Sequence, residues 1–217
     1  MIRKSTSKKS TAIKICGITM SSQARAIAQL RINAIGVIGV KSSPRFVPEE
    51  ECMKIFNEVE KVSSSIEKVL AIANEKLETI QCISKRSNKP SVLQLHGNED
   101  PAYAAKLVRP FIKSIRVKDK SDLDIMSQFV NTTFLLDSFN ANLFGGTGAK
   151  FDWGLIPQRK RNNIILAGGV SRYNVGEIIE EIKPYAVDVS SSIEIEPGKK
   201  DHKKMEELFR VFREAGG

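Results

Sequence analysis

The chain has 217 residues, of which 41% are hydrophobic, and this length and composition suit one compact domain with a sizeable core. Its net charge of +9 would suit a polyanionic partner. However, five of the basic residues lie in the stretch from Arg3 to Lys14, which has no acid, and the rest of the chain contains both signs. Aromatic residues make up only 6% of the chain, which leaves little for stacking on bases, so we expect no nucleic-acid partner.

Cysteine usage and the N-terminal stretch indicate the compartment. Cys16, Cys52 and Cys82 are odd in number and lack C-x-x-C spacing, so we expect neither a disulfide framework nor a metal site, and a reducing cytoplasm fits best. Residues 1–11 are basic and polar, with no apolar core for a signal peptide, and we interpret them as a disordered extension. No apolar run reaches the length of a membrane span, so we expect no membrane contact.

Short apolar runs rich in Ile, Val and Leu recur along the chain, each followed by glycine or polar residues and then by helical spacing. This pattern is typical of parallel strands joined by helices. We predict strands beginning near Ala12, Ala34, Lys68, Ser91, Ile112, Thr133, Ile164 and Ala186. We predict helices from Ser21 or Ser22, as the cap, to Leu30, from Pro48 and Glu49 to Val62, from Val175 to Ile182, and from Asp201 to Glu214.

Strands that alternate with helices, without a long linker, define an α/β protein. Eight such strands favour a single-domain (β/α)8 TIM barrel over residues 12–217 rather than an open doubly wound sheet. The residues that are unusual for a core sit at or just after the ends of the predicted strands, where a barrel builds its active site. They are Cys16-Gly17, Ser43-Pro44-Arg45, Gln94-Leu95-His96-Gly97, Asp137, Gly168-Gly169 and Asp188-Val189-Ser190-Ser191.

The segment Lys14-Ile15-Cys16-Gly17-Ile18-Thr19 closely resembles the signature of the phosphoribosylanthranilate isomerase family. The resemblance continues in family order through Ser43-x-Arg45, Gln94-Leu95-His96-Gly97, Leu135-Leu136-Asp137, Gly145-Gly146-Thr147-Gly148 with Phe151-Asp152-Trp153, Asp188-Val189-Ser190-Ser191 and Pro197-Gly198-Lys199-Lys200-Asp201. It implies an Amadori rearrangement of N-(5'-phosphoribosyl)anthranilate in tryptophan biosynthesis, with a phosphosugar substrate and no cofactor. We expect a monomer or a homodimer.

By this resemblance, Cys16 is the catalytic base and Asp137 the catalytic acid. A thiol with a pKa of about 8.5 can act as a base beside a positive charge, whereas an aspartate must be held protonated by burial to act as an acid. We hypothesise that Lys14, on the same strand face as Cys16, helps hold the thiolate and pairs with Asp188 on the neighbouring last strand. The alternatives are an inert buried thiol and a structural aspartate.

Two loops suit the substrate's phosphate. Gly168 and Gly169 follow the seventh predicted strand, and Ser190 and Ser191 follow the eighth, where barrels often bind phosphate through backbone N–H groups and hydroxyls. A tight turn alone would also explain the glycine pair. The glycines around Gly146 predict a loop that closes over the substrate, with a plain flexible connection as the alternative.

Two further side chains complete the predicted site. Arg45 matches the family residue that pairs with the anthranilate carboxylate, a role that suits a planar guanidinium. His96 is expected to line the site without transferring the proton. Five other residues are given structural roles: a solvated surface position for His202, core packing for Phe151 and Trp153, and apolar positions on helix faces for Cys52 and Cys82.

The chain departs from the family pattern at three positions. Ser192 replaces a usual glycine beside the predicted phosphate site, and Val37 and Gly39 replace aromatics in the second strand, which predicts a wider wall near the anthranilate ring. Two other functions remain open at this stage. One is a related sugar-phosphate barrel isomerase, in which two carboxylates would replace Cys16 and Asp137, and the other is a non-catalytic phosphate-binding barrel.

Overall fold

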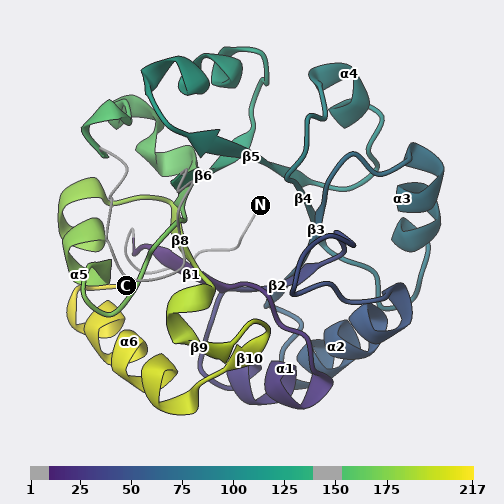
Figure 1. Ribbon diagram of the computed structural model, residues 1–217, viewed down its shortest axis with the longest axis horizontal. Coiled ribbons are helices and arrows are strands. Elements are labelled where there is room, and N and C mark those ends of the chain that lie inside the picture. Colours follow the sequence, from purple (N-terminus) through teal and green to yellow (C-terminus); the bar gives the residue numbers. More distant parts are fainter. Residues whose placement is uncertain (1–9, 139–152) are drawn as a thin grey trace.

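The computed structural model describes residues 10–138 and 153–217. Eight parallel strands form a closed barrel in sequence order, with helices outside it (Figure 1). The predicted (β/α)8 barrel is confirmed, and every strand starts within one residue of its predicted position. The strands are β1 (Ala12–Ile15), β2 (Ala34–Ile38), β3 (Glu67–Ile72), β4 (Val92–Leu95), β5 (Phe111–Val117), β6 (Thr133–Ser138), β7 (Ile164–Leu166) and β8 (Ala186–Val189).

The outer layer consists of helices of unequal length. They are α1 (Ser21–Ala28), α2 (Glu49–Val62), α3 (Leu77–Ser84), α4 (Pro101–Ala104), α5 (Val175–Glu177) continued by a π-helical turn (Ile178–Ile182), and α6 (His202–Glu214). The prediction that Ser21 or Ser22 caps α1 is wrong, because the extended residue before the helix is Met20 and Ser21 is already helical. At α6 the Asp201 carboxylate accepts a hydrogen bond from the backbone N–H of Lys204, so the predicted start is confirmed.

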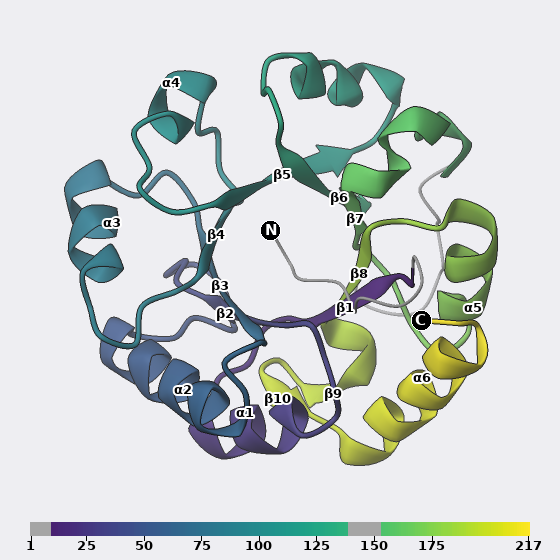
Figure 2. The ribbon, with the colours of Figure 1, turned by 180° about the vertical axis from the view of Figure 1, so that it is seen from behind.

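The barrel wall from β4 to β7 is covered by shorter elements, which the hydrophobic spacing did not reveal. Among the residues that the structure describes there, three 3₁₀ helices occur, at Lys120–Ser127, Trp153–Leu155 and Gln158–Asn163. Under the first of them, Phe129 packs edge-on against Phe111 and Phe134. Figure 2 shows the contrast with the longer α2 and α6 on the other side of the ring. On this side, packed aromatic side chains therefore cover part of the barrel where the other side has long helices.

Alternation along the strands divides the apolar residues into two clusters. The larger cluster lies between the sheet and the helices and includes Val37 of β2. The smaller cluster fills the inside of the barrel and includes Ala12, Ala34, Val69, Val92, Ile112, Leu135, Ile165 and Ala186. By the same alternation, the inward positions one step further along β1 and β8 are Lys14 and Asp188.

An ion pair crosses the seam where the barrel closes. Lys14 of β1 is in register with Asp188 of β8, and the Lys14 Nζ lies 2.9 Å from Asp188 Oδ2. Both side chains are buried, and the Asp188 Oδ1 has no hydrogen-bond partner among the described residues. The predicted pairing of Lys14 with Asp188 is confirmed.

The N-terminal boundary differs slightly from the prediction. Thr11, which we assigned to the disordered extension, is buried, and its hydroxyl donates a hydrogen bond of 3.1 Å to the Pro184 carbonyl oxygen. Residues 1–9 of that extension lie outside the described residues. Within the described ranges, no helix is long and apolar enough to cross a membrane.

We expect Lys14→Met to lower the free energy of unfolding by about 3–5 kcal/mol at pH 8, because a buried charge on Asp188 loses its partner. The loss should shrink at pH 5. Without Lys14, burial raises the pKa of Asp188 in the folded variant above its unfolded value, so the carboxyl contributes stability in acid that is lost as the pH rises.

Urea unfolding at both pH values measures this effect. Lys54→Met is the matched control, because Lys54 is exposed and, within the described part of the chain, forms an ion pair only with Glu51 one helical turn away. It should cost less than about 1 kcal/mol at either pH. Equal losses in the two variants would contradict the proposed importance of the buried pair.

Candidate active site

A cavity of about 290 Å³ opens at the carboxyl ends of the strands, where a barrel places its active site. The structure brings together all of the predicted site residues that it describes. Gly146 lies outside the described residues. The lining residues are Cys16, Ile38, Arg45, His96, Leu135, Asp137, Ala167, Gly168, Gly169, Val170, Asp188, Ser190 and Ser191.

Cys16 follows β1 directly, and its backbone N–H donates a hydrogen bond of 2.8 Å to the Val189 carbonyl oxygen of β8. Its side chain is buried. Burial and, less strongly, the charge of Asp188 raise the pKa of the Cys16 thiol, while Lys14 and, more weakly, Lys200 oppose that rise. The expected effect of Lys14 on the thiol is therefore present, but desolvation is the larger influence in this structure.

Asp137 lies at the end of β6, and its side chain is largely shielded from solvent. Burial, together with the nearby charge of Asp188, raises the pKa of Asp137 to about 6, against the opposing effects of Arg116 and Lys14. Such burial is what we expected from the sequence, because an aspartate can act as an acid at neutral pH only if its pKa is raised. A substantial share of Asp137 is thus protonated at pH 6, where an ordinary aspartate is ionised.

Gly36 of β2 is a site residue that the sequence reasoning missed. A Cβ at this position would lie 2.8 Å from Cys16 Sγ and 3.1 Å from both Cε and Nζ of Lys14. The missing side chain therefore provides the space that the thiol and the ammonium group occupy. Side chains two residues apart share one face of a strand, so the inward position of Ala34 would have predicted from the sequence that Gly36 also faces the barrel interior.

His96 follows β4 at the mouth of the cavity. Burial, Arg116 and Lys14 lower the pKa of His96 to about 4, so the imidazole is neutral at pH 7. Its Nδ1 lies 3.5 Å from the Gln94 Nε2. A neutral ring among cations agrees with the expectation that His96 lines the site.

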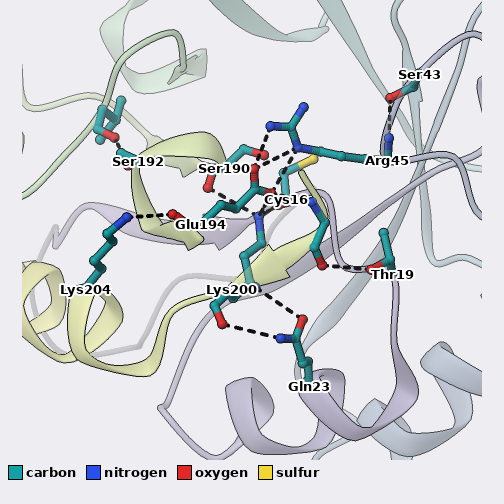
Figure 3. Close-up of polar contacts among 12 residues, drawn as sticks. Cys16, Thr19, Gln23, Ser43, Arg45, Ser190, Ser192, Glu194, Lys200 and Lys204 are labelled. Carbon is teal, nitrogen blue, oxygen red and sulfur yellow. Dashed lines mark hydrogen bonds and ion pairs between the residues drawn. The ribbon is translucent and has the colours of Figure 1, made fainter. Parts of the chain in front are cut away.

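Arg45 reaches the cavity from the loop after β2, where its backbone N–H donates to the Ser43 hydroxyl. Its guanidinium also binds a protein carboxylate (Figure 3). The Arg45 Nε donates to both oxygens of Glu194, at 2.9 and 3.0 Å, and the Nη2 donates to Oε2 at 2.6 Å. Sequence reasoning did not single out Glu194, because no strand spacing connects it with Arg45.

The two predicted phosphate loops meet at one side of the cavity. Gly168 and Gly169 both have positive φ angles, and a Cβ on Gly169 would meet no atom within 4 Å. Ser192, the departure from the family pattern, donates a hydrogen bond of 2.5 Å from its hydroxyl to the Val170 carbonyl oxygen. The hydroxyl of Ser192 thus ties the loop after β8 to the loop after β7.

The other two departures do not widen the cavity as predicted. Val37 points away from the barrel interior into the outer apolar layer, and Gly39 lies beside Leu70 in a separate pocket. The β2 residue that lines the cavity is Ile38. The prediction was wrong because it took positions from the motif without the inward and outward alternation of the strand.

The remaining predicted residues have mixed outcomes. Cys52 is buried on α2, where burial raises its pKa to about 12, but Cys82 on α3 is exposed, so its predicted apolar role is wrong. His202 is on the surface near Glu206, and Trp153 packs partly buried against the core. Phe151 lies outside the described residues. Among the described residues, no cluster of His, Cys, Asp and Glu side chains suits a metal ion.

The N-(5'-phosphoribosyl)anthranilate isomerase family model matches residues 13–211. The chain belongs to this family. It is 35% identical to the N-(5'-phosphoribosyl)anthranilate isomerase of Trichlorobacter lovleyi over 94% of this chain and 98% of that protein. Identity to the isomerase of Pseudomonas putida strain W619 is 38%, over 93% of this chain and 97% of that protein.

Solved structures of the phosphoribosylanthranilate isomerase family have the same fold. The enzyme from Thermotoga maritima matches with a TM-score of 0.84 at 29% identity, covering 94% of this chain and 99% of that one. A family structure in complex with reduced 1-(o-carboxyphenylamino)-1-deoxyribulose 5-phosphate matches with a TM-score of 0.81 at 27% identity, with the same coverage of both chains. This family member is thus an isomerase, an intramolecular oxidoreductase built on the TIM barrel.

We expect Gly36→Ala to destabilise the protein by about 1–3 kcal/mol, because the added methyl group overlaps Cys16 Sγ. The matched control is Gly176→Ala on α5, where the nearest atom to an added Cβ is Val211 Cγ1 at 3.6 Å. That change should be neutral or stabilise by up to about 1 kcal/mol, since alanine favours a helix. Thermal unfolding compares the two, and equal behaviour would rule out a role for the space at Gly36.

Proposed function

We propose that the chain converts N-(5'-phosphoribosyl)anthranilate to 1-(o-carboxyphenylamino)-1-deoxyribulose 5-phosphate, a step of tryptophan biosynthesis, with Cys16 as base and Asp137 as acid. One observation carries the assignment of roles. A thiol and a carboxyl with a raised pKa line the same cavity, beside two loops suited to phosphate. Family membership supports the reaction itself.

The reaction needs an acid that donates a proton to the substrate and a base that removes one from it. Asp137 in its protonated form donates to the ring oxygen of the ribose, which breaks the bond from C1 to that oxygen and leaves a Schiff base at C1. The Cys16 thiolate then removes the proton from C2, which gives an enol-amine. The C2 hydroxyl of this enol-amine loses its proton and C1 gains one, which gives the aminoketone. A single acid and a single base on one substrate suffice for both transfers.

The cavity also provides groups that hold the substrate at both ends. Backbone N–H groups at Gly168 and Gly169, with the hydroxyls of Ser190 and Ser191, suit a phosphate. Arg45 suits the anthranilate carboxylate: Glu194 orients its Nε and Nη2, whereas its Nη1 makes no hydrogen bond to the described residues.

Asp188 supplies an acceptor between these two ends. Asp188 lines the cavity, and its buried Oδ1 lacks a partner among the described residues, so it is suited to accept a hydrogen bond from a ribose hydroxyl.

Replacing either proton-transfer group should abolish most of the activity. We expect Cys16→Ala and Asp137→Asn each to lower kcat by about 10²–10⁴-fold with folding intact, because general acid–base steps contribute about that much. The readout is the fluorescence decrease as freshly made phosphoribosylanthranilate is consumed. Cys82→Ala removes an exposed thiol outside the cavity and is the control. Full activity of Cys16→Ala would refute the mechanism.

The pH dependence should show how the two groups share one proton. Below about pH 6 both Cys16 and Asp137 are protonated, so kcat/KM should rise as the pH approaches 6, where the pKa of Asp137 lies. It should then stay level while one proton remains on the pair, and fall when burial-raised Cys16 loses the second proton.

The variant Arg116→Gln tests whether the acidic limb of the kcat/KM profile belongs to Asp137. Arg116 lowers the pKa of Asp137, so its removal should move that limb to higher pH by up to about one unit. A limb that belonged to the substrate's own phosphate would not move, and such a result would contradict the role of Asp137.

Ser192→Ala should raise KM by about 3–10-fold with kcat within about twofold, because losing one hydrogen bond loosens the two phosphate loops before substrate binds. Ser127→Ala is the matched control: its hydroxyl also donates to a backbone carbonyl, that of Asp124 at 2.7 Å, but on the surface. Steady-state kinetics on both variants are the measurement. An unchanged KM in Ser192→Ala would show that this contact does not organise the phosphate site.

A further inference from the structure

A short hairpin after β8 reaches the end of β1. The 3₁₀ turn Ser191–Ile193 leads into β9 (Glu194–Glu196), which pairs antiparallel with β10 (Lys199–Lys200). Thr19 donates its hydroxyl proton to the Gly198 carbonyl oxygen at 2.7 Å, which fastens the hairpin to the segment after Cys16 (Figure 3). The hairpin is therefore held against the strand end that carries the base.

Lys200 points from this hairpin into the protein, and its side chain is 0% exposed. Its Nζ donates to the carbonyl oxygen of Cys16 at 2.6 Å and to that of Ser190 at 3.3 Å. The third contact is an ion pair of 2.7 Å with Glu194 Oε1. An ammonium has three protons, and all three acceptors lie within the site, so Lys200 ties the ends of β1 and β8 together.

The charges around Cys16 do not cancel. Lys14 is neutralised by Asp188 through their buried ion pair. On the other side, Glu194 is shared by two cations, Arg45 and Lys200, so that cluster has one positive charge more than it has negative charges. In a buried setting an excess charge acts over a longer distance than in water, and here Lys200 contacts the backbone carbonyl oxygen of Cys16 itself.

We propose that Lys200 is a positioning residue for Cys16, which holds its backbone and supplies the excess positive charge that stabilises its thiolate. The inference rests on the proposed role of Cys16 as base. The competing explanation is that Lys200 only satisfies backbone carbonyls and braces the hairpin. The two explanations differ in one measurable respect, since only the first makes the acidity of the thiol depend on the charge of Lys200.

The test is the pH dependence of Cys16 alkylation by iodoacetamide in the whole protein, followed by mass spectrometry of the Cys16 peptide. This readout needs no substrate, so it stands even if Cys16 proves not to be the base. In Lys200→Met the thiol pKa should rise, and alkylation at pH 8 should slow by about 3–10-fold. In Lys200→Arg, which keeps the charge, the rate should recover toward that of the wild type.

Two comparisons separate charge from bracing. Lys204 on α6 donates to the Glu194 carbonyl oxygen at 2.6 Å, so Lys204→Met loosens the same hairpin and should leave the thiol pKa unchanged. Glu194→Gln removes the counter-charge while leaving Lys200 in place, and it should lower the thiol pKa. This opposite shift tests the proposal even if Lys200→Met fails to fold.

Activity measurements complete the test. Lys200→Met should lower kcat with KM within about twofold, and the alkaline limb of kcat/KM should move to higher pH, because that limb reports the thiol. An unchanged thiol pKa in folded Lys200→Met, or an unchanged or raised pKa in Glu194→Gln, would overturn the proposal. Either result would leave the isomerase reaction itself untouched.

Discussion

The closure of β8 on β1 is the constraint on which the rest of the molecule depends. It buries a lysine and an aspartate inside the barrel, where neither charge is tolerable alone, and sets them in register so that they pair at 2.9 Å. A shift of one residue in either strand would turn that strand's charged side chain out of the interior and leave the other without its partner. The ion pair thus specifies the seam of the barrel and, with it, the position of Cys16 two residues beyond Lys14.

From this seam the charges of the active site follow. Burial, together with the charge of Asp188, raises the pKa of Asp137, and Asp188 also pairs with Lys14, so a carboxyl with a raised pKa and a buried thiol share one cavity. The hairpin after β8 brings Lys200 and Glu194 to the other side of Cys16. Different parts of the chain therefore surround the two groups: Asp137 is influenced from inside the barrel, whereas Cys16 is influenced both by Lys14 inside the barrel and by Lys200 of the hairpin.

Much of the architecture could be predicted, because the information is local. Apolar runs bounded by glycine and polar residues marked all eight strands, and Asp201 marked the start of α6. The elements between β4 and β7 were missed, since the four-residue α4 is too short to show a helical period and 3₁₀ helices have about three residues per turn instead of about 3.6. Val37 was misplaced because a motif names residues without saying which face of the strand they occupy.

The sequence by itself determined the fold class, the order of the strands and the types of residue at their ends, because hydrophobic periodicity and motif order are properties of neighbouring residues. Only the tertiary structure decided which of those residues act on one another. The space at Gly36, the clamp of Glu194 on Arg45 and the approach of Lys200 to Cys16 join residues far apart in the chain. Closing the barrel brings them together, and burial then gives their charges an effect that no local pattern records.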